Sequence, residues 1–197
     1  MAERDLSKLP ANLPAPQDDG AAAHLAGYAL PHLELEATNG TRVNLSHLAG
    51  RVVVFAFPRT GQPGKAPLVA DWDEIPGARG CTPQVCRYRD LAAEFAALDC
   101  RVFGLSTQSP EYQREMATRL AVPFPILSDA DLTLVNALKL PTMTLAGEVL
   151  IKRMSWLAID GRIVRVTYPV FPSDRNADVM LQIVASTRTS STTSPSR

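Results

Sequence analysis

Short apolar runs and helical repeats alternate along most of the chain. The segment Arg51–Pro58 contains a continuous Val-Val-Val-Phe run, which predicts a buried strand in the interior of a sheet. Apolar residues then recur at helical spacing from Cys81 to about Leu98. Thr82 and Pro83 are residues typical of a helix cap and a first helical turn. We therefore predict that Cys81 lies at the N-terminus of a helix.

The other periodic segments alternate between strand and helix patterns. Strands are predicted around His32–Glu36, Arg42–Leu45 and Arg101–Ser106, and two longer ones at Glu148–Ile159 and Arg162–Tyr168. Three helices are predicted: one opened by Ser109-Pro110-Glu111, one near Asp131–Leu138, and a last one capped by Ser173. Asp160-Gly161 between the last two strands is a strong two-residue hairpin signal. This order predicts an α/β fold with a mixed central sheet flanked by helices.

Length and composition fit one domain with loose ends. The chain has 197 residues, 46% of them hydrophobic, which is enough to bury a core without disulfides or metals. Residues 28–186 hold the periodic segments and form the predicted domain. Residues 1–27, with several prolines and an alanine run, predict a flexible N-terminal arm, and residues 187–197 predict a flexible tail. Residues 59–80 are rich in Pro and Gly and predict a long inserted loop.

Charge and motif content exclude several classes of function. Twenty basic residues balance twenty acidic ones, so binding to nucleic acid or to an anionic membrane has no electrostatic support. The longest apolar run, Val52–Phe57, is too short to span a bilayer. His24, His32 and His47 lack metal-ligand spacing, and no phosphate loop, paired-carboxylate motif or serine-hydrolase motif occurs. We expect a cytoplasmic protein that acts on a small neutral substrate without metal or cofactor.

The cysteines are the residues best suited to chemistry. Three cysteines are too few for a disulfide scaffold, and in a reducing compartment such residues are more often catalytic, redox-sensing or metal-binding. A thiol attacks peroxide as the thiolate, and both a helix N-terminus and a nearby guanidinium stabilise a thiolate. Cys81 has the first of these features. A second thiol must then remove the sulfenic acid, and Cys86 is the nearest candidate.

The spacing of the two cysteines has a conformational consequence. On one helix, five positions separate Cys81 and Cys86 by about 7.5 Å of rise and place them on different faces, beyond the usual range for a disulfide. We therefore predict that disulfide formation requires the first turns of this helix to unwind.

Three segments resemble a known family. Val53–Pro58, the run Gly-Cys-Thr-Pro-Gln-Val-Cys-Arg-Tyr-Arg-Asp at residues 80–90, and Phe124–Asp129 are similar to the bacterioferritin-comigratory, or Q-type, branch of the peroxiredoxins. The similarity extends over roughly residues 28 to 185 and includes Lys152-Arg153. It implies a thioredoxin-like fold and a thiol-dependent peroxidase that reduces hydrogen peroxide or organic hydroperoxides and is recycled by thioredoxin or a similar thiol reductant.

The same resemblance implies roles for single residues. Cys81 would be the peroxidatic cysteine, Cys86 the resolving cysteine, Arg153 the guanidinium that polarises the peroxide, and Pro58 a shield of the pocket. One departure concerns a threonine that the family places three residues before the cysteine, where this chain has Ala78. Thr60 or Thr82 could supply the missing hydroxyl, and the sequence does not choose between them.

Other interpretations stay open at this point. Cys81 and Cys86 could be two buried small residues, Cys100 is most simply a bystander, and Arg153 could be a surface charge. A thioredoxin-like thiol–disulfide oxidoreductase normally has its cysteines two residues apart, so the wider spacing here counts against it. A redox sensor without turnover is the other alternative. Glutaredoxin or glutathione as reductant, and a monomer or a homodimer, are equally compatible with the sequence.

Overall fold

The computed structural model describes residues 5–187. The described strands are β1 (Leu35–Ala37), β2 (Arg42–Val43), β3 (Arg51–Ala56), β4 (Cys100–Ser106), β5 (Ile126–Ser128), β6 (Thr142–Leu145), β7 (Glu148–Ile151), β8 (Met154–Ile159) and β9 (Arg162–Thr167). The α-helices are α1 (Cys81–Asp90), α2 (Ala92–Ala97), α3 (Pro110–Arg119), α4 (Thr133–Leu138) and α5 (Asn176–Ser186). In this part of the chain no helix is long and apolar enough to cross a membrane.

A mixed sheet forms the centre of the molecule, as predicted. Its strand order is β2-β1-β5-β4-β3-β8-β9, and β3 pairs in parallel with β4 and antiparallel with β8. The predicted hairpin joins β8 to β9 through Asp160 and Gly161, both at positive φ. Glycine is required at position 161 because a Cβ there would lie 2.6 Å from the Ser46 carbonyl oxygen.

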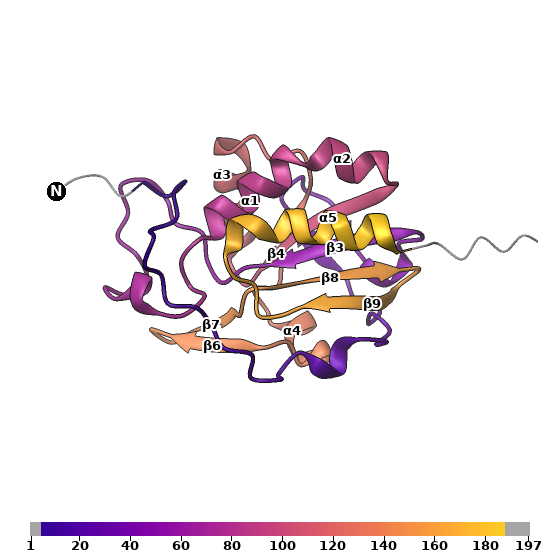
Figure 1. Cartoon of the computed structure of the whole chain (residues 1–197), viewed down its shortest axis with the longest axis horizontal. Coiled ribbons are helices and arrows are strands. Elements are labelled where there is room, and N and C mark those ends of the chain that lie inside the picture. The colour runs from indigo at the N-terminus through magenta and orange to yellow at the C-terminus, as the bar shows by residue number, and fades with distance from the viewer. Residues whose placement is uncertain (1–4, 188–197) are drawn as a thin grey trace, which may run out of the picture.

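Helices cover both faces of the sheet. Successive side chains of a strand point to opposite faces, so Val53 and Phe55 of β3 pack with α1, α2, α3 and α5, whereas Val52 and Val54 pack with α4 and the segment around Leu25. Figure 1 shows α1, α2, α3 and α5 on one side of the strands and α4 on the other. The buried β3 run is therefore explained by helices on both faces.

The N-terminal segment differs from the loose arm expected for residues 1–27. Leu25 is fully buried in the core, and the Gly27 N–H donates to the Ile163 carbonyl oxygen at 2.8 Å. Lys152 forms an ion pair with Asp19. Residues 5–27 thus lie against the domain, because a few apolar side chains, several hydrogen bonds and an ion pair anchor a segment that has no periodicity of its own. The predicted tail at 187–197 lies outside the described residues beyond Thr187.

Two local predictions need correction. The helix expected to run to about Leu98 breaks between α1 and α2, and its N-cap is Gly80 rather than Thr82, which lies in the first turn. The expected strand Glu148–Ile159 is two strands: β7 pairs with β6 in a separate two-stranded sheet, and β8 belongs to the central sheet. The break between them falls at Lys152-Arg153, which places Arg153 directly before β8.

Candidate active site

Cys81 is the first residue of α1 and is held in a tight environment. It follows Gly80, whose φ of 105° is left-handed and whose missing Cβ leaves room for Leu9 and Ser173. The Cys81 side chain is only 3% exposed and belongs to the same apolar core as Phe55 and Phe57. The prediction that Cys81 lies at a helix N-terminus is confirmed. Unpaired backbone N–H groups and the positive end of the helix dipole therefore surround this thiol.

Arg153 brings a full positive charge to Cys81. Its Nη2 lies 3.1 Å from Cys81 Sγ and also donates to the carbonyl oxygens of Gly77, Ala78 and Arg79 at 3.1–3.2 Å. The side chain is 3% exposed. None of the ion pairs found within residues 5–187 includes Arg153. No carboxylate of the described residues thus neutralises the guanidinium, and its charge is available to a thiolate at Cys81.

Arg79 is a second buried guanidinium in this region. It donates to the carbonyl oxygens of Asp5 and Lys8 and forms an ion pair of 3.8 Å with Asp73. Burial lowers the pKa of Arg79, and the negative charge of a Cys81 thiolate would act in the opposite direction. Arg79 was not singled out by the sequence, because it lies in a Pro/Gly-rich loop without periodicity.

A buried polar network fixes Arg153 from the protein interior. Gln84 accepts a hydrogen bond from Arg153 Nη1 and donates to Asn176 Oδ1 at 2.9 Å. The same Asn176 oxygen accepts from the Tyr88 hydroxyl, and Asn176 Nδ2 donates to Ser155 Oγ, both at 2.8 Å. All five side chains are buried. Gln84 and Asn176 are residues that sequence reasoning missed, since neither a mid-helix glutamine nor an asparagine near a helix start is a distinctive signal.

The hydroxyl candidates lie away from this network. Thr60 donates to Gln108 Oε1 at 3.1 Å. Thr82 is buried and lines a cavity between α1 and α3 together with Leu6. Within residues 5–187, no hydrogen bond joins either hydroxyl to Cys81 or Arg153. At the position where the resemblance expects a threonine hydroxyl, the carbonyl oxygen of Ala78 contacts Cys81 Sγ at 3.6 Å. Pro58 is buried two residues beyond the end of β3.

Cys86 lies on α1 about one turn beyond Cys81. It is half-buried, and all three cysteines are free thiols. Burial raises the pKa of Cys86, and the neighbouring Arg89 partly offsets this effect. Cys100 is buried at the start of β4, where burial raises its pKa to about 11. A thiol with that pKa is almost entirely protonated at neutral pH, which fits the expected bystander.

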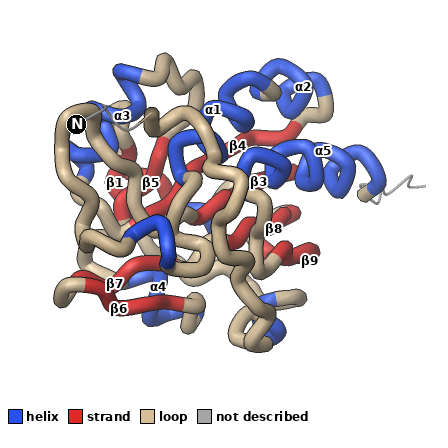
Figure 2. The backbone as a smooth tube through the Cα atoms, turned by 60° about the vertical axis from the view of Figure 1, so that its left-hand side comes forward, coloured by secondary structure: helices blue, strands red, loops and turns tan. Residues whose placement is uncertain are grey.

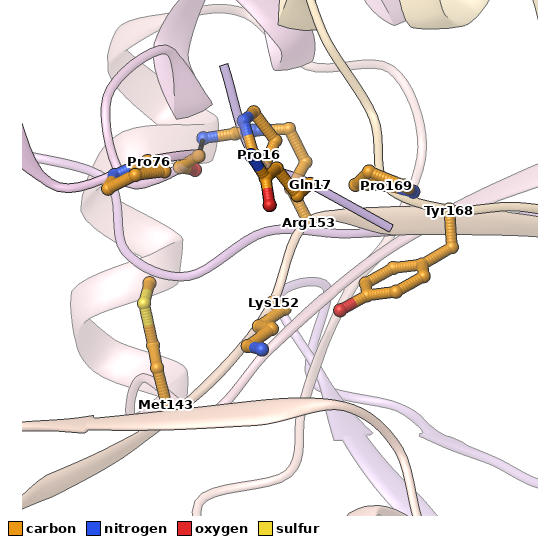
Figure 3. A pocket seen from close by; sticks show the side chains of 9 residues that line it. Pro16, Gln17, Pro76, Met143, Lys152, Arg153, Tyr168 and Pro169 are labelled. Carbon is orange, nitrogen blue, oxygen red and sulfur yellow. Dashed lines mark hydrogen bonds between the residues drawn. The ribbon is translucent and has the colours of Figure 1, made fainter. Parts of the chain in front are cut away.

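A cavity of about 130 Å³ lies beside Arg153. Pro16 and Gln17 line it from the N-terminal segment, Pro76 from the inserted loop, and Met143 from β6. Figure 3 shows Pro16 and Gln17 next to the Arg153 side chain, with Lys152 and Tyr168 on other sides of the cavity. Figure 2 shows loops running across this side of the molecule, between α1 and the β6–β7 hairpin. Segments far apart in the sequence therefore close around the guanidinium.

Comparison with known proteins gives a consistent picture. The Redoxin family model matches residues 25–181. A Mycobacterium tuberculosis protein whose name places it among the peroxiredoxins is 28% identical over 165 residues, which cover 82% of this chain and 97% of that protein. Peroxiredoxin Bcp of Bacillus subtilis is 30% identical over 112 residues, 56% of this chain and 61% of that protein.

Solved structures agree with this assignment. The crystal structure of peroxidoxin BcpB from M. tuberculosis superposes with a TM-score of 0.66 at 27% identity, covering 83% of this chain and 98% of that one. A structure of Xanthomonas campestris peroxiredoxin Q gives a TM-score of 0.61 at 20% identity, covering 88% and 96%. The predicted thioredoxin-like α/β fold is confirmed. The chain therefore belongs to the Redoxin family, as a thiol-dependent peroxidase of the peroxiredoxin Q/Bcp branch.

Proposed function

We propose that Cys81 is the nucleophile of this peroxidase and that Arg153 stabilises the charges of the reaction. The observation that carries the proposal is the 3.1 Å contact between Arg153 Nη2 and the sulfur of Cys81, at the first residue of α1. The thiolate attacks one peroxide oxygen, the O–O bond breaks, and the sulfur becomes a sulfenic acid. The other oxygen leaves as hydroxide or alkoxide and takes a proton from solvent, while the guanidinium stabilises its developing negative charge.

Cys86 resolves the sulfenic acid in this scheme. Its sulfur attacks Cys81, an intramolecular disulfide forms, and water leaves with the sulfenic oxygen. In the folded helix both the spacing along α1 and the raised pKa of the half-buried Cys86 oppose this step. Unwinding of the first turns of α1 would remove both obstacles, because it frees the backbone and exposes the thiol to water. Resolution is therefore coupled to local unfolding.

The substrates proposed are hydrogen peroxide and organic hydroperoxides, and a thioredoxin-type dithiol is the proposed reductant. The cavity beside Arg153 supports the organic class, since Pro16, Pro76 and Met143 offer an apolar wall next to the guanidinium. An exposed disulfide in an unwound helix would be accessible to a dithiol protein. The reductant supplies two electrons and two protons, which return Cys81 and Cys86 to thiols.

Stopped-flow consumption of hydrogen peroxide by pre-reduced protein, with thioredoxin and its reductase supplying electrons, tests the proposal. Wild type should turn over many times, Cys81→Ser should be inactive, and Cys86→Ser should be oxidised once without recycling. Cys100→Ser is the matched control, a third free thiol that should leave turnover unchanged. Multiple turnover by Cys81→Ser would refute the assignment. One stoichiometric oxidation of wild type, not reversed by any thiol reductant, would instead identify a redox sensor.

A further inference from the structure

The hydrogen-bonding capacity of Arg153 fixes the orientation of two buried amides. An arginine has only donors, so the Gln84 atom that faces Arg153 Nη1 must be the carbonyl oxygen. The Gln84 NH₂ group then points to Asn176, which must present its own oxygen in return. The Asn176 NH₂ group is left to face Ser155 Oγ. The direction of every bond in this row follows from the guanidinium at its end.

Tyr88 donates the second hydrogen bond to the Asn176 side-chain oxygen. Its hydroxyl donates to the same oxygen that accepts from Gln84, so both lone pairs of Asn176 Oδ1 are occupied. Gln84 and Tyr88 are four residues apart and therefore lie on one face of α1. Ser155 and Arg153 are two residues apart, with Ser155 on β8. Asn176, the first residue of α5, thus connects the reactive end of α1 to the strand segment that carries Arg153.

We propose that Asn176 is a positioning residue that acts on Arg153 through Gln84. Without the Asn176 oxygen, the buried NH₂ group of Gln84 loses its acceptor, and the Gln84 side chain is no longer held from below in the place where its oxygen accepts from Arg153. Arg153 then lacks a fixed acceptor on Nη1, so that only the contacts of Nη2 with Cys81 and the loop carbonyl oxygens hold the guanidinium, and its position beside the sulfur becomes less well defined. The inference rests on the proposed role of Cys81.

The rate of oxidation of Cys81 in a background of Cys86→Ser and Cys100→Ser tests this role, because resolution and the third thiol are then removed. Asn176→Leu should slow the second-order reaction with hydrogen peroxide roughly 10- to 100-fold, the loss expected for one misplaced charged hydrogen bond. Gln84→Leu should slow it to a similar extent. Since Asn176 acts through Gln84, the double variant should be no slower than Gln84→Leu alone.

The matched control is Asp178→Asn. This variant weakens a different contact between α5 and α1, the ion pair of Asp178 with Arg87. Neither of these two side chains contacts Arg153 through a hydrogen bond or ion pair within the described residues. The oxidation rate should stay at that of the background protein. If Asn176→Leu lowers the melting temperature strongly, Asn176→Asp, which keeps the accepting oxygen for Gln84 and Tyr88, should restore most of the rate.

The outcomes separate this inference from the proposed function. Failure of the background protein itself to react with peroxide would remove the proposed role of Cys81. If the background protein reacts rapidly, two results would overturn the positioning role alone. One is an unchanged oxidation rate in Asn176→Leu. The other is a double variant in which the effects of Asn176→Leu and Gln84→Leu on the rate multiply.

Discussion

The two sides of Cys81 are built from different kinds of interaction. On the inner side, Arg153, Gln84 and Asn176 form a network of buried side chains in which Arg153 Nη1, Gln84 Nε2 and Asn176 Nδ2 each donate to one side-chain oxygen. On the outer side, residues 5–19 are joined to the inserted loop by backbone carbonyls that accept from Arg79, and to the segment before β8 by the partly exposed ion pair of Lys152 with Asp19. Buried polar networks are costly to break, whereas exposed ion pairs contribute little. The inner network is thus costly to disturb, whereas the Lys152–Asp19 contact on the outer side is weak.

The largest effect on the rate of peroxide reaction should come from removing the Arg153 guanidinium on the inner side. Arg153→Met deletes the charge beside the Cys81 sulfur, and we expect oxidation by hydrogen peroxide to slow by about 10²- to 10³-fold, as for loss of one preorganised charge-stabilising group. Stopped-flow oxidation measures this rate. Arg165→Met, which alters an exposed arginine on β9, is the matched control and should react at the wild-type rate. Equal rates in the two variants would contradict the role of Arg153.

Two tyrosine variants test whether the inner side contributes more to the free energy of unfolding than the outer side. Tyr88→Phe removes a fully buried hydroxyl from the Asn176 oxygen, and burial raises the pKa of Tyr88 so that it is a neutral donor. We expect a loss of about 1 kcal/mol in the free energy of unfolding, measured by urea titration. Tyr112→Phe removes a half-buried hydroxyl that donates to the Thr60 carbonyl on the outer side. Water can replace that bond, so Tyr112→Phe should lower the free energy of unfolding by less than Tyr88→Phe does. A larger loss in Tyr112→Phe than in Tyr88→Phe would contradict the comparison.

The sequence predicted the parts of this site that depend on local pattern. The valine run of β3, the Asp160-Gly161 turn and the position of Cys81 follow from residues that are neighbours in the chain. The resemblance added the fold and pointed to Arg153. Gln84 and Asn176 could not be found in this way, because their partners lie about 70 to 90 residues away along the chain. Only the folded topology brings these side chains together.

The N-terminal segment was mispredicted for a related reason. Its prolines and alanines show no periodicity, so composition alone indicates a loose arm. Anchoring comes from single residues, such as Leu25 in the core and Asp19 at Lys152, and isolated anchors leave no pattern in a sequence. The β6–β7 hairpin was missed similarly, since its turn at Ala146-Gly147 joins strands outside the central sheet.

The pH dependence of Cys86 alkylation tests whether this thiol is buried by the folded helix α1. Burial raises the pKa of this thiol, so the folded helix favours the protonated form. The stabilisation is present below the ordinary thiol pKa and is lost as pH rises through the higher pKa of the folded state. In Cys81→Ser with Cys100→Ser, alkylation of Cys86 should therefore rise at higher pH than alkylation of the urea-unfolded chain. Coincident pH profiles would mean that Cys86 is already exposed in the reduced protein.

The smallest effect is expected at the ion pair that closes the outer side. Asp19 accepts from Lys152 Nζ at 2.7 Å and from the Tyr168 hydroxyl at 2.8 Å. These bonds hold the pKa of Asp19 below its usual range, so the contact persists above the ordinary carboxyl pKa and is lost only in acid, as pH falls through the lowered pKa of the folded state. If closure limits access to Cys81, Asp19→Asn should raise the rate of Cys81 alkylation by iodoacetamide about two- to fivefold.

Asp18→Asn is the matched control for this closure. Asp18 is the adjacent exposed carboxylate, and its bond is to the Gly20 backbone N–H rather than to Lys152. Its alkylation rate should equal that of wild type. Added salt should accelerate wild type toward the rate of Asp19→Asn and leave that variant nearly unchanged, because an exposed ion pair is screened whereas the buried contacts of Arg153 are not. Equal acceleration of both proteins by salt would show that access to Cys81 is controlled elsewhere than at residue 19.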